Sequence, residues 1–208
     1  MSYTKGADAA ATVVEAIKRS GGKAIAVQAD ATAADQVNAA IDKTVNSLGK
    51  LDVFVNNAGT AVPKKFEETT LQELDRVIDI NLRGAFVATQ AALKRMNEGG
   101  RIILIGSCVG ERIMTPRLVA LRGHQRRDQN VRAGVGQGSG GPRHHGHNNI
   151  QPGPIDTELN PAASEWAVPQ KALTALNRYG SVNDVAGLVA FVAGPEASYI
   201  VDCEVGRV

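Results

Sequence analysis

Cysteine is scarce in this chain, and long apolar runs are missing. The 208 residues include two cysteines, Cys108 and Cys203. They lie far apart with no further cysteine or histidine at metal-site spacing beside them, which argues against a disulfide scaffold. Met1 is followed by polar residues rather than by an apolar signal segment, and no run is long enough to span a bilayer. We therefore expect a cytoplasmic protein with no membrane association and no dedicated metal site.

A strong excess of charge of one sign is also lacking. Lys and Arg number 23 against 21 Asp and Glu, which gives a formal net charge of +2 at pH 7. So small an imbalance does not point to a polyanionic partner, and we expect no nucleic-acid partner. With 43% hydrophobic and 21% charged residues, the composition predicts one globular domain over 1–208 with a sizeable core.

Helical and extended patterns alternate along most of the chain. Amphipathic spacing predicts helices over 9–19, 34–48 and 71 to about 96, and a capping box at Ser181 and Asp184 opens an apolar helix over 185–192. Short apolar runs over 24–27, 51–55 and 101–105 predict strands. Because these strands are apolar on both faces and are separated by helices, we expect right-handed βαβ units around a parallel sheet.

The apolar run Leu51–Val55 stops abruptly at Asn56-Asn57-Ala58-Gly59. Valine and phenylalanine followed by small, turn-forming residues are typical of a buried parallel strand that enters a loop at its carboxyl end. Ligands of open α/β sheets bind at this end of the strands. The sequence therefore predicts a ligand site beside the Asn56–Gly59 loop.

Several short motifs then occur in the order and spacing of one enzyme family. They are Gln28-Ala29-Asp30, Asn56-Asn57-Ala58-Gly59, Ile80-Asn81-Leu82-Arg83-Gly84, Ile105-Gly106-Ser107 and Gln151-Pro152-Gly153-Pro154-Ile155-Asp156-Thr157. Over 6–116 and 149–200 the chain resembles a classical short-chain dehydrogenase/reductase, similar to 3-oxoacyl-carrier-protein reductases. The resemblance implies a Rossmann-like, doubly wound parallel sheet in three α/β/α layers. It also implies hydride transfer between NAD or NADP and a small carbonyl or alcohol substrate.

The resemblance assigns a set of residues at strand ends to the cofactor. Asp30 would contact the adenine ring, the loop after Asn56 would border the adenosine ribose, and the Ile155 backbone would meet the carboxamide. The full set is Asp30, Asn56, Ala58, Gly59, Pro152, Gly153, Ile155 and Thr157.

Two further residues would be catalytic by the same resemblance. Ser107 would bind the substrate oxygen, and Asn81 would anchor a water relay. Plainer interpretations stand beside these roles, because Asp and Ser after a strand often form caps and turns, and an isolated Asn is often a satisfied core amide. Trp166 follows the Pro-Gly loop, where it either lines a substrate pocket or covers the edge of the core.

Three parts of the family pattern are absent from this sequence. The family's first strand and Gly-rich turn, which receives the pyrophosphate, have no counterpart, so we expect an N-terminal truncation of about 30 residues and a sheet without its central strand. The family's Tyr-x-x-x-Lys falls on Leu121 and Gln125, and neither can act as a tyrosine whose pKa is lowered by a lysine. Residues 201–208 do not follow the family's final strand, which leaves open the homo-oligomer that the family suggests.

Residues 117–147 form an irregular stretch with six arginines, seven glycines and no lysine. We hypothesise that 121–147 is an out-of-frame reading of the family's own helix, because one extra base after the Ala120 codon lets Tyr and Lys codons overlie Leu121 and Gln125. Two other interpretations are a nucleic-acid-binding basic segment, which lacks interleaved aromatic residues, and a metal site at 144–147, which lacks a nearby carboxylate.

Two functions follow for the whole chain. The first is an NAD(P)-dependent oxidoreductase with carbonyl-reducing or alcohol-oxidising chemistry, impaired here because the proton donor is missing. The alternative is a catalytically inactive relative that acts as a binding or assembly protein. Neither the substrate nor the choice between NAD and NADP can be inferred from these residues, because both depend on variable or absent segments.

Overall fold

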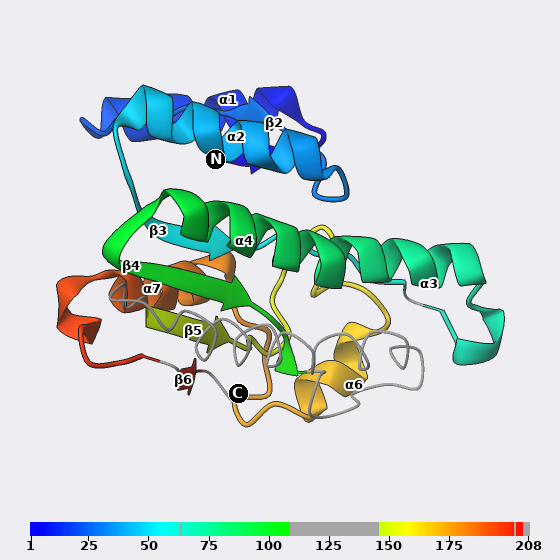
Figure 1. Cartoon of the computed structure of the whole chain (residues 1–208). Coiled ribbons are helices and arrows are strands. Elements are labelled where there is room, and N and C mark those ends of the chain that lie inside the picture. Colours follow the sequence, from blue (N-terminus) through cyan, green and yellow to red (C-terminus); the bar gives the residue numbers. More distant parts are fainter. Residues whose placement is uncertain (63, 109–145, 202, 206–208) are drawn as a thin grey trace.

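The computed structural model describes residues 1–62, 64–108, 146–201 and 203–205. The helices and strands alternate as the sequence predicts (Figure 1). They are β1 (Ser2–Tyr3), α1 (Ala7–Arg19), β2 (Val27–Gln28), α2 (Ala34–Leu48), β3 (Leu51–Asn56), η1 (Phe66–Glu68), α3 (Leu71–Ile78), η2 (Asp79–Gly84), α4 (Ala85–Arg95), β4 (Met96–Ile105), β5 (Gly146–Ile150), α6 (Ala167–Ala172), α7 (Val182–Ala193), η5 (Pro195–Ala197) and β6 (Cys203–Val205).

A four-stranded sheet with the order β3-β4-β5-β6 forms the centre of the molecule, and all its strands are parallel. Ile102 and Leu104 of β4 face α4 and α2, where they pack with Ala92. Ile103, between them in sequence, faces the other way and packs with Ile150 and with Val192 of α7. The strands are therefore apolar on both faces, as predicted, and helices cover both, which confirms the three-layer α/β/α fold.

A second, two-stranded parallel sheet contains β1 and β2 alone. It lies apart from the larger sheet, with α1 and α2 beside it (Figure 1). Among the described strands, β1 pairs only with β2 and β3 pairs only with β4, so each has one unpaired edge. Val55, the next-to-last residue of β3, is 39% exposed. This division agrees with the expectation of a sheet without its central strand.

The helix predicted over 71 to about 96 is continuous, but its middle turn is widened. A capping box between Thr70 and Glu73 opens α3, and η2 is a π-helical turn that leads into α4. The chain then becomes extended at Met96, earlier than the strand predicted from Arg101, and the β3–β4 register shifts between Leu51 and Val53.

Other boundaries differ from the sequence expectations. The strand predicted over 24–27 is reduced to Val27–Gln28, α7 begins at Val182, and β1, α6 and β6 were not anticipated. The capping box of Ser181 and Asp184 is present as predicted. Most of the stretch 117–147 lies outside the described residues, but Gly146 and His147 belong to β5, so the irregular segment ends earlier than expected.

In the described ranges, no helix is both long and apolar enough to cross a membrane.

The α3 capping box is expected to make the stability of the fold depend on pH. The pKa of Glu73 is lowered to about 2, chiefly by the hydrogen bond from Lys64 and then by the Thr70 backbone N–H. Because the folded pKa lies below the unfolded one, this carboxylate stabilises the fold above about pH 4.5, and the contribution disappears as the pH falls toward 2.

We expect Glu73→Gln to lower the urea midpoint at pH 7 and to have a smaller effect at pH 3. Glu67→Gln is the control, because the Glu67 carboxylate makes no hydrogen bond or ion pair among the described contacts. An equal destabilisation by Glu73→Gln at both pH values would contradict the assignment.

Candidate active site

The carboxyl ends of three neighbouring strands are aligned at one edge of the sheet. Asn56, the last residue of β3, pairs in register with Leu104 of β4, and Leu104 pairs with Asn149 of β5. Ile105 and Ile150 form the last pair of β4 and β5. The segments that follow these strands contain the predicted residues of the site, so the ladder brings distant motifs to one edge.

Backbone hydrogen bonds continue this ladder beyond the strands. The N–H of Gly106 donates to the carbonyl of Ile150 at 2.8 Å, and the N–H of Cys108 donates to the carbonyl of Pro152 at 3.0 Å. Ser107 lies between these two bonds and is half-buried. The predicted substrate-binding serine is thus held directly beside the Pro152 loop.

Asn81 lies in the π-helical turn η2 and clamps the loop that follows Gly59. Its Oδ1 accepts a hydrogen bond from the Thr60 N–H, and its Nδ2 donates to the Thr60 carbonyl, both at 2.8 Å. These two bonds fix the orientation of the amide and the position of the loop. Oδ1 retains a lone pair and Nδ2 retains a second hydrogen, so a water or ligand contact remains chemically available.

Asp30 lies two residues after β2, and its side chain makes hydrogen bonds within the loop that follows this strand. One carboxylate oxygen, Oδ1, accepts from the Thr32 backbone N–H at 2.9 Å and from the Thr32 hydroxyl at 2.8 Å. These bonds lower the pKa of Asp30, the backbone bond more than the hydroxyl bond. Asp30 therefore closes a turn with Thr32 and is not the cap of α2 that the plainer interpretation expected, because Ala33 is the N-cap residue and no side chain caps this helix. The other oxygen, Oδ2, makes none of these bonds.

Gly84 brings the Asp30 loop close to Asn81. A Cβ added at Gly84 would lie 2.7 Å from the Ala31 carbonyl oxygen, so the loop after β2 rests directly on the start of α4. Gly84 is three residues after Asn81, within the same helical turn. The motifs around Asp30, Asn56 and Asn81 are thereby joined through this contact and the Thr60 clamp.

The Pro152–Thr157 loop is attached to the segment before α7. The Gly180 N–H donates to the Pro154 carbonyl, and the Asp156 N–H donates to the Gly180 carbonyl, both at 2.9 Å. In such a parallel bridge the N–H and C=O of the central residue, Ile155, point to the opposite side. A primary carboxamide carries both an N–H donor and a carbonyl acceptor, so these two groups of Ile155 fit a nicotinamide.

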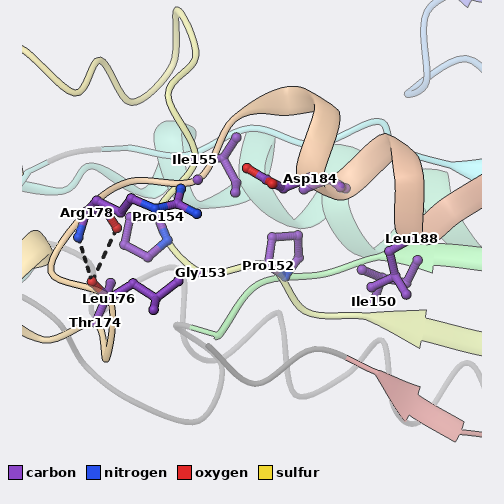
Figure 2. A pocket seen from close by; sticks show the side chains of 12 residues that line it. Ile150, Pro152, Gly153, Pro154, Ile155, Thr174, Leu176, Arg178, Asp184 and Leu188 are labelled. Atoms are coloured by element: carbon purple, nitrogen blue, oxygen red, sulfur yellow. Dashed lines mark hydrogen bonds between the residues drawn. The ribbon is translucent and has the colours of Figure 1, made fainter.

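A pocket of about 240 Å³ lies between this loop and α7 (Figure 2). Its wall is mostly apolar, and Arg178 and Asp184 supply charge. The lining residues are Ile150, Pro152, Gly153, Pro154, Ile155, Thr174, Leu176, Arg178, Gly180, Asp184, Val185 and Leu188. Ser107, Asn81 and Thr157 do not line it, so the pocket borders the loop without containing the whole predicted site.

The remaining predicted residues are placed as follows. Ala58 and Gly59 are exposed in the loop after β3, and Thr157 is half-buried at the end of the Pro152 loop. Leu121 and Gln125 lie outside the described residues, as do His144 and His145. Within the described ranges, no group of three or more His, Cys, Asp or Glu side chains could hold a metal ion.

Sequence reasoning missed three polar residues beside Thr157. They are Asn160, Gln170 and Tyr179, which are joined by side-chain hydrogen bonds. A weak signal was present, because Asn160 stands just after the Thr157 motif, but Gln170 and Tyr179 come from segments with no pattern that links them.

Comparison with known proteins agrees with this geometry. Residues 1–205 match the family model described as Enoyl-(Acyl carrier protein) reductase. An uncharacterised oxidoreductase of Methylorubrum extorquens is 39% identical over 203 residues, which are 96% of this chain and 80% of the relative.

Solved structures superpose over nearly the whole chain. A short-chain dehydrogenase/reductase from Serratia marcescens gives a TM-score of 0.94 at 40% identity, covering 99% of this chain and 84% of that one. A short-chain dehydrogenase from Burkholderia cenocepacia, solved in complex with NADP, gives 0.94 at 36%, covering 98% and 83%. The chain belongs to the short-chain dehydrogenase/reductase family, whose members are NAD(P)-dependent oxidoreductases.

The contact at Gly84 is testable without any ligand. Gly84→Ala forces the Asp30 loop away from α4, because the new methyl group meets a backbone oxygen. We expect a loss of about 1–3 kcal/mol of unfolding free energy in urea titrations. Gly187→Ala in α7 is the control, since nothing lies within 4 Å of its added Cβ, and we expect it to be neutral or to stabilise by up to about 1 kcal/mol. Similar results for both variants would argue against the close approach.

Proposed function

We propose that this chain binds NAD or NADP and acts on a small carbonyl or alcohol, with an impaired proton-transfer step. The observation that carries the proposal is the pair of Ile155 backbone groups that face away from Gly180. They belong to a loop whose first residue, Pro152, accepts a hydrogen bond from the N–H of Cys108, the residue after Ser107. When bound, the nicotinamide supplies or accepts a hydride. The chain's own residues orient the two reactants for that step.

The proposed cofactor contacts follow the strand ends. Asp30 Oδ2 is available to the adenine ring, and the backbone of Asn56, Ala58 and Gly59 borders the adenosine ribose. At the other end, Pro152 and Gly153 shape the loop wall while Ile155 binds the carboxamide. The Thr157 hydroxyl oxygen accepts from the Asn160 N–H at 3.2 Å, which leaves the hydroxyl hydrogen to donate to the nucleotide.

The proposed catalytic contacts are fewer. The Ser107 hydroxyl orients the substrate oxygen, and Asn81 supports a proton relay through its remaining donor and acceptor. The positions that would provide a general acid hold Leu121 and Gln125, and neither side chain can supply a proton at a useful rate. Loss of a general acid commonly lowers the rate by about 10²–10⁴-fold.

Substrate, location and assembly are proposed from the family motifs and the composition. A 3-oxoacyl thioester or a related ketone suits the family motifs, and the small number of cysteines, two in 208 residues, suits a reducing cytoplasm. Homo-oligomer formation is proposed from the family alone. The competing function, an inactive relative that works by binding, retains the cofactor contacts but dispenses with Ser107.

Thermal-shift titration with NADH and NADPH tests the binding half of the proposal. At a ligand concentration of about 100 Kd we expect about 2.7 kcal/mol of stabilisation, or roughly 5–10 °C for a domain of this size. Thr157→Val is expected to reduce the shift, because it keeps the shape of the side chain and removes the hydroxyl. The absence of a shift with both nucleotides would refute cofactor binding.

A frame-restored gene tests the catalytic half. Removal of one base after the Ala120 codon, with the present frame resumed before Asn149, should place Tyr and Lys at positions 121 and 125. Oxidation of NADPH with a panel of ketones is expected to be about 10²–10⁴-fold faster for that protein than for the present chain. Ordinary turnover by the present chain, or a shifted frame without Tyr-x-x-x-Lys, would contradict the hypothesis.

A further inference from the structure

The segment 158–178, which contains α6, is joined to the Pro152–Thr157 loop at two places. The Ala162 N–H donates to Asp156 Oδ1 at 2.8 Å, and Asn160 makes the remaining contacts. Asn160 Nδ2 donates to Gln170 Oε1 at 3.1 Å, and Asn160 Oδ1 accepts from the Tyr179 hydroxyl at 3.2 Å. A longer contact of 3.5 Å runs from Gln170 Nε2 to the same Oδ1. One amide thus joins α6 to the strand-like segment before α7.

The backbone of Asn160 makes the connection to Thr157. Its N–H donates to the Thr157 carbonyl at 3.1 Å and to the Thr157 hydroxyl oxygen at 3.2 Å. The Asn160 backbone is thus bonded directly to Thr157, and the Asn160 side chain anchors that backbone to Gln170 and Tyr179. The group of Thr157, Asn160, Gln170 and Tyr179 is called the Asn160 cluster below.

The cluster is shielded from solvent. Gln170 and Tyr179 are each 7% exposed, and Asn160 is half-buried. Burial raises the pKa of Tyr179, so its hydroxyl remains a protonated donor toward Asn160. Lys171 covers the outer side, with its Nζ 5.7 Å from the centre of the Tyr179 ring and 3.1 Å from the Ala162 carbonyl. Buried polar groups arranged in this way are bound to one another, and loss of one leaves the others unsatisfied.

We propose that Asn160 is a positioning residue that couples the 158–178 segment to the Thr157 hydroxyl, so that nucleotide binding and the packing of this segment are linked. The inference rests on the proposed cofactor site and adds a residue to it. Asn160 itself need not touch the nucleotide, because it acts through Thr157 on one side and through Gln170 and Tyr179 on the other.

Trp166 provides a local reporter of this coupling. It is the only tryptophan of the chain, it lies directly before α6, and it is 41% exposed. Quenching of its fluorescence by acrylamide measures how accessible the segment is to solvent. In the present chain we expect saturating NADP⁺ to reduce this quenching, because a bound nucleotide fixes Thr157 and with it the segment.

Two variants remove the coupling to different extents. Asn160→Ala deletes all three side-chain contacts, whereas Tyr179→Phe deletes one hydroxyl and keeps the ring in place. We expect Asn160→Ala to weaken NADP⁺ binding about tenfold and to abolish the effect of NADP⁺ on Trp166 quenching. Tyr179→Phe should act in the same direction with a smaller, roughly two- to fivefold loss of affinity. Tyr199→Phe is the matched control, because Tyr199 is 97% exposed.

A third variant tests whether the cluster acts as a unit. If Gln170 acts through Asn160, Asn160→Ala/Gln170→Ala should bind NADP⁺ no more weakly than Asn160→Ala alone. Unchanged affinity and unchanged Trp166 quenching in Asn160→Ala and Tyr179→Phe would overturn the inference. Failure of the present chain to bind any nucleotide would instead overturn the cofactor site. In that case, increased Trp166 quenching in Tyr179→Phe but not in Tyr199→Phe would still support the anchoring of the segment.

Discussion

The in-register ladder of β3, β4 and β5 is the constraint on which the rest of this structure depends. It aligns Asn56, Leu104 and Asn149 across the sheet, and its hydrogen bonds continue past the strands to Pro152. Each site loop therefore starts from a position that is set by backbone pairing rather than by its own sequence. The start of each loop is fixed in space by the strand before it, because the strands are hydrogen-bonded in register. Motifs about fifty residues apart in sequence therefore meet at one edge of the sheet.

The division of the sheet has an energetic consequence. A strand with one open edge leaves backbone N–H and C=O groups to water, and it lacks the apolar cover of a neighbouring strand. Val55 is exposed at this place, although the same residue type would be buried in a continuous sheet. The small β1–β2 sheet must then be held by helices, chiefly through α2 packing on α4 near Asp42 and Arg95, whose side chains form an ion pair of 2.8 Å.

Periodicity predicted those parts of the fold that bury a continuous apolar face. The helix over 34–48 and the strand from Leu51 were found nearly residue for residue because burial leaves a regular pattern. Strands β1 and β6 have two and three residues, too few for any period. The first five residues of β4, 96–100, have no apolar alternation, although Met96 itself is buried in the core. Sequence motifs could place candidate site residues at strand ends, where motifs are local. The site was not predictable at Gln170 or Tyr179, because their role arises from tertiary contact alone.

The structural and functional interpretations of the site residues are compatible because each residue has more bonding capacity than its loop uses. Asp30 uses one carboxylate oxygen to accept from Thr32, and Asn81 uses one donor and one acceptor to bind Thr60. The Thr157 hydroxyl accepts one hydrogen bond, from the Asn160 N–H. What remains on each side chain is thereby oriented before any ligand arrives, which lowers the entropic cost of binding. Proton transfer differs in the proposed function, because it depends on the residue types at positions 121 and 125 rather than on bonding capacity held in reserve at the strand ends. The proposal therefore treats binding and catalysis as separable, since they rest on different residues of the chain.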